Sequence, residues 1–220
     1  MSHLDTELHY LKEQLIEMQL LVRSQLSKGK EAFFKFNREL AKEILSGEKK
    51  INDLELQVDR SCENILALFN PVAIDLRFIL AAMKINANLE RIGDNAEGIA
   101  RYILDVDTLF DKNIIEAYQV EEMYKATFSM MEDALDAFIQ EDTSLARKVF
   151  QKDDILDAIN RKATQTMLQF IQSGHPKPLH CLNTLSIIRK LERVGDQTKN
   201  IAEEIIFYLE AKVLKHGQQE

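Results

Sequence analysis

Apolar residues recur every three or four positions along almost the whole chain, which is the spacing of residues on one face of an α-helix. No stretch of strict alternation is long enough to predict a β-strand, and only seven glycines and three prolines occur in 220 residues. Glycine and proline are the residues that most often interrupt helices. We therefore predict an all-α fold made of long helices.

Residues that can end a helix divide this pattern into six segments. Asn37 and the pair Asn70-Pro71 separate the first three, because proline disfavours helical geometry in the residue before it. Later breaks fall at the polar connection 105–113, at the capping residues 141–143 and at the hairpin 174–178. The predicted helices span residues 4–36, 38–70, 71–104, 114–140, 144–173 and 178–215.

The sequence also contains an internal repeat. Glu90-Arg-Ile-Gly-Asp94 recurs as Glu192-Arg-Val-Gly-Asp196 at an offset of 102 residues, and residues 39–45 recur more loosely as 144–150 at an offset of 105. Duplication of this kind predicts two copies of one three-helix unit, that is, two three-helix bundles packed together. The first repeat is predicted to span residues 1–107 and the second residues 108–220.

Charge and hydropathy exclude several classes of protein. There are 36 acidic and 28 basic residues, a net charge of -8, which argues against a general nucleic-acid binder. The longest apolar run, Phe78 to Met83, is far shorter than the ~20 residues of a membrane span, and the N-terminus has no leader pattern. We expect a cytoplasmic protein in which Cys62 and Cys181 are reduced core residues.

The repeated motif places two acids on one face of each third helix. Glu90 and Asp94 are four residues apart, and so are Glu192 and Asp196, so each pair lies one helical turn apart. A glycine stands between the acids of both pairs, although glycine costs ~1 kcal/mol relative to alanine inside a helix. We therefore expect a neighbour or a ligand to approach the backbone there.

Antiparallel helices meet at equal distances from their hairpin, which identifies the residues opposite these acids. Counting places Glu48 and Asn52 in the first bundle, and Asp153 and Asp157 in the second, at these levels. Clustered oxygen ligands without cysteine suit a hard or borderline cation. Because Asn52 leaves one carboxylate fewer in the first bundle, we expect the second to bind metal more tightly.

Other interpretations stay open at this stage. The acids could form a solvated face, and this is our expectation for Glu55 and Asp59, which fall nearer the hairpin. Arg91 and Arg193 could neutralise the acids or pair with a carboxylate across the bundle interface. Asp75 falls near the start of a predicted helix, where a negative charge interacts favourably with the helix dipole. Catalysis is disfavoured, because the chain lacks the Glu-x-x-His pairs of di-iron bundles and the common hydrolase and phosphate-loop motifs.

Together these residues resemble a known family. Asp75-Leu-Arg77, Lys84, Leu89-Glu-Arg-Ile-Gly-Asp94 and the second copy Leu191-Glu-Arg-Val-Gly-Asp196 are similar to the PhoU family of phosphate uptake regulators, and the likeness covers the whole chain as two repeats. The family's acid-x-x-x-Asp motif, which holds multinuclear iron or zinc in some members, maps onto Glu90 with Asp94, Asp153 with Asp157 and Glu192 with Asp196. Glu48 with Asn52 departs from it by one carboxylate.

The resemblance implies a function as well as a fold. It implies a cytoplasmic, mostly dimeric, non-enzymatic accessory of the phosphate-specific ABC transporter that restrains phosphate uptake and phosphate-starvation signalling. The partners would be the transporter ATPase and a phosphate-sensing histidine kinase, with Asp75, Arg77, Arg91 and Arg193 as candidate contact residues. A metal-free helical scaffold that serves another transporter or kinase is the alternative.

Overall fold

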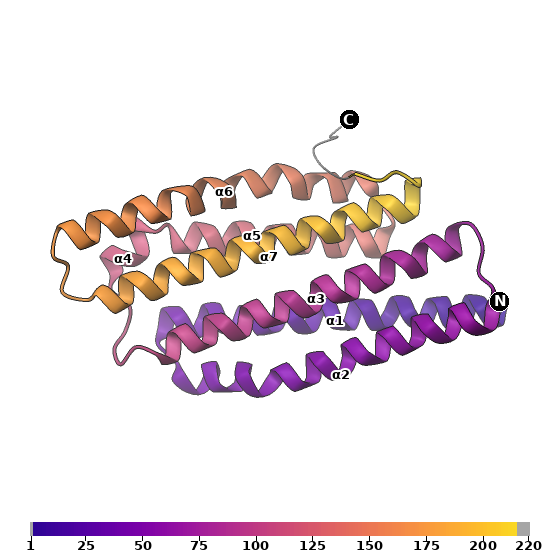
Figure 1. The fold of residues 1–220 in the computed structure, drawn as a ribbon, viewed down its shortest axis with the longest axis horizontal. Coiled ribbons are helices and arrows are strands. Elements are labelled where there is room, and N and C mark those ends of the chain that lie inside the picture. Colours follow the sequence, from indigo (N-terminus) through magenta and orange to yellow (C-terminus); the bar gives the residue numbers. More distant parts are fainter. Residues whose placement is uncertain (1, 215–220) are drawn as a thin grey trace.

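The computed structural model describes residues 2–214, and within this range it contains seven α-helices and no β-strand (Figure 1). The all-α prediction is confirmed. The helices are α1 (His3–Lys35), α2 (Arg38–Phe69), α3 (Ile74–Leu104), α4 (Lys112–Ala117), α5 (Val120–Gln140), α6 (Thr143–Gln172) and α7 (Pro178–Glu210).

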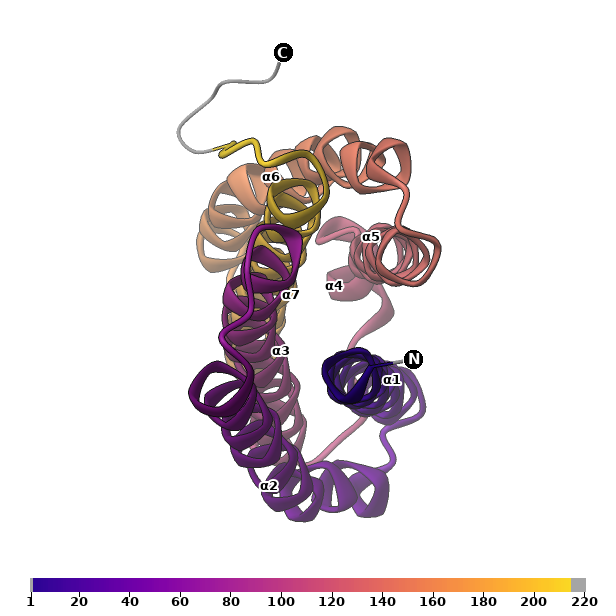
Figure 2. The ribbon, with the colours of Figure 1, turned by 90° about the vertical axis from the view of Figure 1, so that its right-hand side faces the viewer.

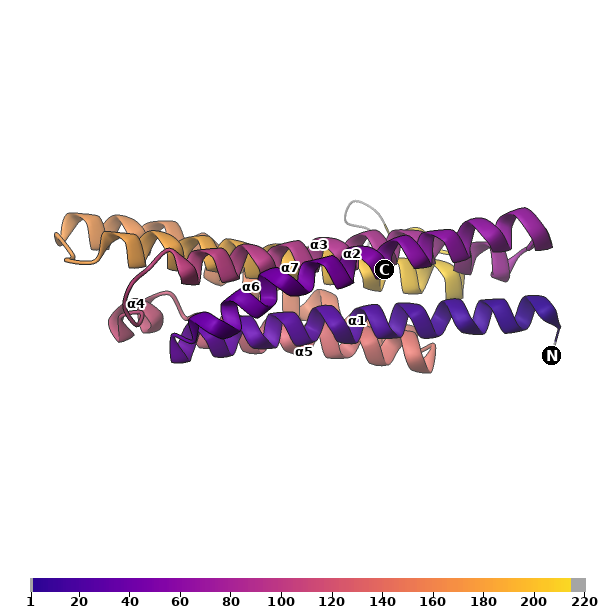
Figure 3. The same cartoon turned by 90° about the horizontal axis from the view of Figure 1, so that it is seen from below.

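The long helices form two three-helix bundles, α1 to α3 and α5 to α7, which meet along α3 and α7 (Figure 1). Seen end-on, α2, α3, α7 and α6 make one curved layer, and α1 and α5 pack on its concave side (Figure 2). Figure 3 shows the two layers from below, with the short α4 beside α5. The α2–α3 and α6–α7 hairpins point to opposite ends of the molecule (Figure 1). Because each set of three long helices packs together, the predicted pair of three-helix bundles is confirmed.

Asparagine and aspartate side chains end or begin helices where the sequence predicted breaks. The Asn37 side chain accepts a hydrogen bond from the Leu40 amide at 3.1 Å and so caps α2. Asn70 closes the same helix in the left-handed conformation, at φ 48°. Asp142 caps α6 by accepting from the Ser144 amide at 2.7 Å. These short polar side chains compensate free backbone groups at the helix ends.

Two predicted boundaries were wrong. The segment predicted as one helix over 114–140 is split into α4 and α5, because Gln119 adopts a left-handed φ of 53° although no glycine or proline marks the site. The break allows Ile114 and Tyr118 to be buried, and the burial of large side chains outweighs the local preference of this segment for one continuous helix. The last helix ends at Glu210 rather than near Lys215, which lies outside the described residues.

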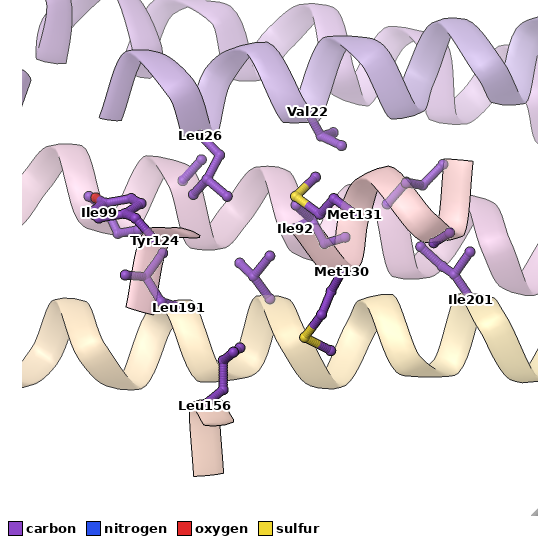
Figure 4. Packing of buried hydrophobic residues seen from close by; sticks show 14 of the residues in the cluster. Val22, Leu26, Ile92, Ile99, Tyr124, Met130, Met131, Leu156, Leu191 and Ile201 are labelled. Atoms are coloured by element: carbon purple, nitrogen blue, oxygen red, sulfur yellow. The ribbon is translucent and has the colours of Figure 1, made fainter. Parts of the chain in front are cut away.

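The core lies between the two layers and joins the bundles. Val22 and Leu26 of α1 point towards the row that holds Ile92 and Ile99 of α3, while Leu156 of α6 points towards α7 (Figure 4). All five side chains are almost fully buried. Burial of each such side chain contributes about 1.5–3 kcal/mol, so the helical stripes read from the sequence determine how the helices face one another.

Cys62 and Cys181 are buried free thiols, as predicted. His180 is also buried: its ring packs on Phe110 with centroids 5.2 Å apart, and its Nε2 lies 3.3 Å from Thr108 Oγ1. None of the helices within residues 2–214 is long and apolar enough to cross a bilayer.

Candidate functional site

Each bundle carries a group of polar, mostly acidic side chains where its second and third helices meet. All eight residues predicted as metal ligands fall in these two groups, which are extended by residues that the sequence reasoning missed. The first cluster consists of Glu48, Asn52, Glu55, Glu90, Asp94 and Glu97. The second cluster consists of Asp153, Asp157, Asn160, Glu192, Asp196 and Lys199.

The repeated glycines let the two helices of each hairpin approach closely. A Cβ atom on Gly93 would lie 2.8 Å from Ile51 Cδ1, and one on Gly195 would lie 2.5 Å from Leu156 Cδ2. Ile51 and Leu156 are equivalent in the two repeats at the offset of 105. The expectation that a neighbour approaches the helix backbone at these positions is confirmed, and the neighbour is the preceding helix.

Carboxylates in the first cluster raise one another's pKa. The pKa of Glu48 is raised first by the negative charge of Glu97, then by burial and by further contact with Glu97 and Asp94. The pKa of Glu90 is raised mainly by burial, and then by the charges of Asp94 and Glu55. Negative charge is therefore concentrated at this helix contact, and a cation would relieve the repulsion.

Glu55 and Asp59 were expected to form a solvated face off the level of the cluster; both are half-buried, and for Glu55, which belongs to the first cluster, the expected position was wrong. The fully buried Asn86 side chain of α3 donates to the Glu55 carbonyl oxygen and to Asp59 Oδ1, both at 2.9 Å. Residues 70–73 belong to neither helix, which shifts the register counted from the hairpin. Glu90 is 16 residues beyond the start of α3, and Glu55 is 14 residues before the end of α2, so these two acids lie at similar levels.

The second cluster has a related arrangement with a different balance of charge. Burial raises the pKa of Glu192, and the charges of Asp196 and Asp157 raise it further, while a hydrogen bond with Asn160 lowers it. The pKa of Asp196 is raised by burial and by neighbouring carboxylates, but the Lys199 ammonium opposes this rise. A positive charge is therefore part of the second cluster.

Lys199 pairs with the most deeply buried acid of the second cluster. Its Nζ lies 2.7 Å from Asp153 Oδ2, and Asp153 is only 5% exposed. The other oxygen, Asp153 Oδ1, is buried and has no hydrogen-bond partner among the described residues. The sequence contained a signal for this residue, because Lys199 follows Glu192 by seven positions and so lies two turns along the same helix face.

These additions change the comparison between the clusters. The expectation of tighter metal binding in the second bundle rested on Asn52, which left three predicted carboxylates in the first. The structure adds Glu55 and Glu97 to the first cluster and the positive charge of Lys199 to the second. The carboxylate count therefore no longer supports that ranking.

The donor chemistry suits a cation, but these side-chain positions do not yet form a ligand shell. Within residues 2–214, no three His, Cys, Asp or Glu side chains are placed so as to hold a metal ion. Glu48, Asp94 and Glu97 line a cavity of about 850 Å³ that also reaches Lys190 on α7. Metal binding at the first cluster would therefore require these carboxylates to rotate towards one another, and the cavity provides room for it.

The four candidate partner-contact residues have separate surroundings. Asp75 lies in the first turn of α3, where an acid favours the helix dipole, and the Arg77 Nε donates to the Tyr208 carbonyl oxygen at 3.3 Å. Arg91 and Arg193 are exposed and form no ion pair within the described part of the chain. Their charges partly offset the raised pKa values of the neighbouring Glu90 and Glu192, which fits neutralisation rather than pairing across the interface.

Comparison with known proteins identifies both repeats. The chain matches the PhoU domain twice, over residues 15–103 and 120–205. It is 36% identical over 211 residues to a phosphate-specific transport system accessory protein PhoU homolog of Aquifex aeolicus, and the alignment covers 96% of this chain and 94% of the relative. It is 31% identical over 214 residues to homolog 1 of Thermotoga maritima, covering 97% and 91%.

The fold is also shared with a solved structure. The crystal structure of PhoU from Pseudomonas aeruginosa superimposes with a TM-score of 0.88 at 30% sequence identity. The alignment covers 94% of this chain and 99% of that one, so both bundles and their mutual arrangement are included.

Proposed function

Because this chain belongs to the PhoU family, we propose that it is an accessory protein of a phosphate-specific transport system. The relatives from Aquifex aeolicus and Thermotoga maritima carry that description and match over more than nine-tenths of both lengths. This full-length match, both repeats included, is the observation that carries the proposal. A family of accessory proteins also agrees with the prediction that the chain is not an enzyme.

The finer part of the proposal is negative regulation. The protein acts in the cytoplasm as a homodimer that restrains phosphate uptake through the transporter ATPase and starvation signalling through a phosphate-sensing histidine kinase. The net charge of -8 supports docking on basic surfaces of such partners, because complementary charge speeds and orients association. Asp75, Arg77, Arg91 and Arg193 remain the candidate contact residues.

Deletion of the gene tests this regulatory role. In phosphate-rich medium the deletion strain should take up more labelled phosphate than its parent and should express a phosphate-starvation reporter, and the intact gene should reverse both. A variant with Arg91→Glu and Arg193→Glu tests the contact residues, because both side chains are exposed and their loss leaves the core intact. Unchanged uptake and reporter activity in the deletion strain would reject phosphate regulation in favour of another transporter.

We also propose that this chain binds a divalent cation, iron or zinc, through acidic side chains of its clusters. Support comes from the oxygen donors gathered at each helix contact and from the raised pKa of Glu48, Glu90, Glu192 and Asp196, which reflects burial and mutual repulsion. When bound, such a cation would neutralise the clustered charge. The competing interpretation is a metal-free scaffold.

Thermal melts with chelator and with added Zn²⁺ or Fe²⁺ distinguish these interpretations. Binding to the folded state at a hundredfold excess over the dissociation constant adds about 2.7 kcal/mol to stability. Replacing Glu90 and Glu192 by Gln, and Asp94 and Asp196 by Asn, should stabilise the metal-free protein and abolish the effect of metal. A wild-type melting temperature that does not respond to metal favours the metal-free scaffold.

A further inference from the structure

The ion pair between Lys199 and Asp153 is the feature that distinguishes the two clusters. Asp153 lies where α6 approaches α7 at Gly195, and its Oδ1 is 3.5 Å from the position of a Cβ on that glycine. Its Oδ2 accepts a hydrogen bond from Lys199 Nζ at 2.7 Å. One oxygen of the most buried carboxylate in the second cluster is thus already occupied by a cationic group of the chain itself.

The repeat shows what stands in the same place in the first bundle. At the offset of 102, Lys199 corresponds to Glu97, and at the offset of 105, Asp153 corresponds to Glu48. Glu97 and Glu48 are again neighbours, because both side chains line the same cavity. The same pair of positions therefore holds a salt bridge in one bundle and two carboxyl groups in the other.

The difference in charge decides which cluster can accept a divalent cation. Asp153 Oδ1 has no hydrogen-bond partner within residues 2–214, but a cation bound to it would lie close to the Lys199 ammonium on Oδ2, so like-charge repulsion opposes binding. Two basic groups lie near the first cluster: Arg101 pairs with Glu97 through a side chain that is 64% exposed, and Lys190 lines the cavity without forming an ion pair with a described residue. Glu48, Glu55, Glu90 and Asp94 make no ion pair with any residue in the described part of the chain.

We infer that Lys199 is the resident cation of the second cluster, which is therefore a structural ion-pair site, and that a divalent cation binds only at the first cluster. The inference rests on the proposed binding of metal by this chain. Each chain then binds metal at one of its two clusters only. The two repeats, which share a fold and a motif, have separate tasks: one joins α6 to α7 without metal, and the other responds to metal.

Metal titration of the full chain and of charge variants tests this assignment. Zn²⁺ binding is measured by calorimetry, and bound metal is measured by elemental analysis after gel filtration. Lys199→Gln should bind additional Zn²⁺ at the second cluster, where the wild type binds none. Arg189→Gln is the matched control, because Arg189 is an exposed basic residue of α7 that belongs to neither cluster, and the metal content of this variant should equal that of the wild type.

Paired neutralisation assigns the wild-type metal to a cluster. Glu90→Gln with Asp94→Asn should remove the bound Zn²⁺, whereas Glu192→Gln with Asp196→Asn should leave it in place. The reverse result would overturn the inference while leaving metal binding itself intact. A Lys199→Gln protein that gains no Zn²⁺ would also overturn it, and a circular dichroism spectrum identical to that of the wild type shows that any gain comes from the folded state.

A stability measurement without metal tests the claim that the Lys199–Asp153 ion pair is structural. A double-mutant cycle with Asp153→Asn and Lys199→Gln, followed by urea unfolding in chelator, should show that the two substitutions are less costly together than their separate effects predict. Additive effects would overturn the role of Lys199 as resident cation. If neither the wild type nor any variant binds metal, the metal-binding part of the proposed function is wrong, and so is the claim that a divalent cation binds at the first cluster.

Discussion

Replacing Gly195 by alanine tests the close helix contact that underlies both clusters. The new Cβ would lie 2.5 Å from Leu156 Cδ2 and 3.7 Å from Met130 Cε. To reach an ordinary separation, the Leu156 methyl group must move by roughly 1 Å. Leu156 is fully buried between α6 and α7, so this movement pushes on packed neighbours rather than on solvent.

Two opposing effects determine how much Gly195→Ala changes the free energy of unfolding. Alanine favours a helix over glycine by ~1 kcal/mol, and forcing an extra methyl group into a packed core costs ~1–3 kcal/mol. Gly195→Ala should therefore lower the free energy of unfolding by up to ~2 kcal/mol. Gly29→Ala is the matched control, because Gly29 is also buried in a helix but its Cβ would lie 3.6 Å from the nearest atom, Ile99 Cγ2. This control should be stabilised by up to ~1 kcal/mol.

Urea unfolding followed by far-ultraviolet circular dichroism measures both variants against the wild type. The expected result is that Gly195→Ala is less stable than Gly29→Ala by ~1–3 kcal/mol. Adding Leu156→Val to Gly195→Ala should recover part of the loss, because the shorter side chain vacates the contact. Equal stabilisation by both alanines would refute the steric reasoning, and with it the claim that the repeated glycines exist to bring the helices together.

Three further measurements test other contacts. Asn86→Leu removes the donor shared by Asp59 and the Glu55 carbonyl and should cost ~1–3 kcal/mol in urea unfolding, with Asp59→Asn costing less because an amide oxygen still accepts. Hydrogen bonds with Arg147 lower the pKa of Glu210 to about 2, so this group stabilises the fold above its ordinary pKa of 4.5 and loses the effect as pH falls towards 2. Glu210→Gln should thus cost at most ~1 kcal/mol at pH 7, because the pair is partly exposed, and almost nothing at pH 2. Burial raises the pKa of Cys62 to about 12, so in a Cys181→Ser background a thiol reagent at pH 8 should leave Cys62 unmodified until the protein is unfolded, and rapid labelling of the folded protein would contradict its buried position.

Local features of the sequence predicted most of the fold. Periodicity located the long helices, and Asn37, Asn70 and Asp142 located their ends, because capping depends on the side chain and backbone of a few adjacent residues. The internal repeat predicted two similar bundles. The break at Gln119 was missed, because it arises from burying Ile114 and Tyr118 and not from a residue that interrupts helices.

The composition of the acidic clusters was predicted in part. The repeated motif identified Glu90, Asp94, Glu192 and Asp196 from spacing alone, since residues four apart share a helix face. Glu55 was assigned to solvent, because counting from a hairpin assumes that both helices begin at its tip, and the non-helical residues 70–73 break that assumption.

The sequence by itself determined that this chain is helical, duplicated and acidic at one repeated position, because periodicity, repetition and charge are properties of the order of residues. Only the tertiary structure decided that Lys199 meets Asp153 while Glu97 meets Glu48. Both pairs join residues more than forty positions apart, so their contacts depend on helix register. That register is set by the packing of Gly93 on Ile51 and of Gly195 on Leu156, where the fit of buried side chains fixes how far one helix slides along the other.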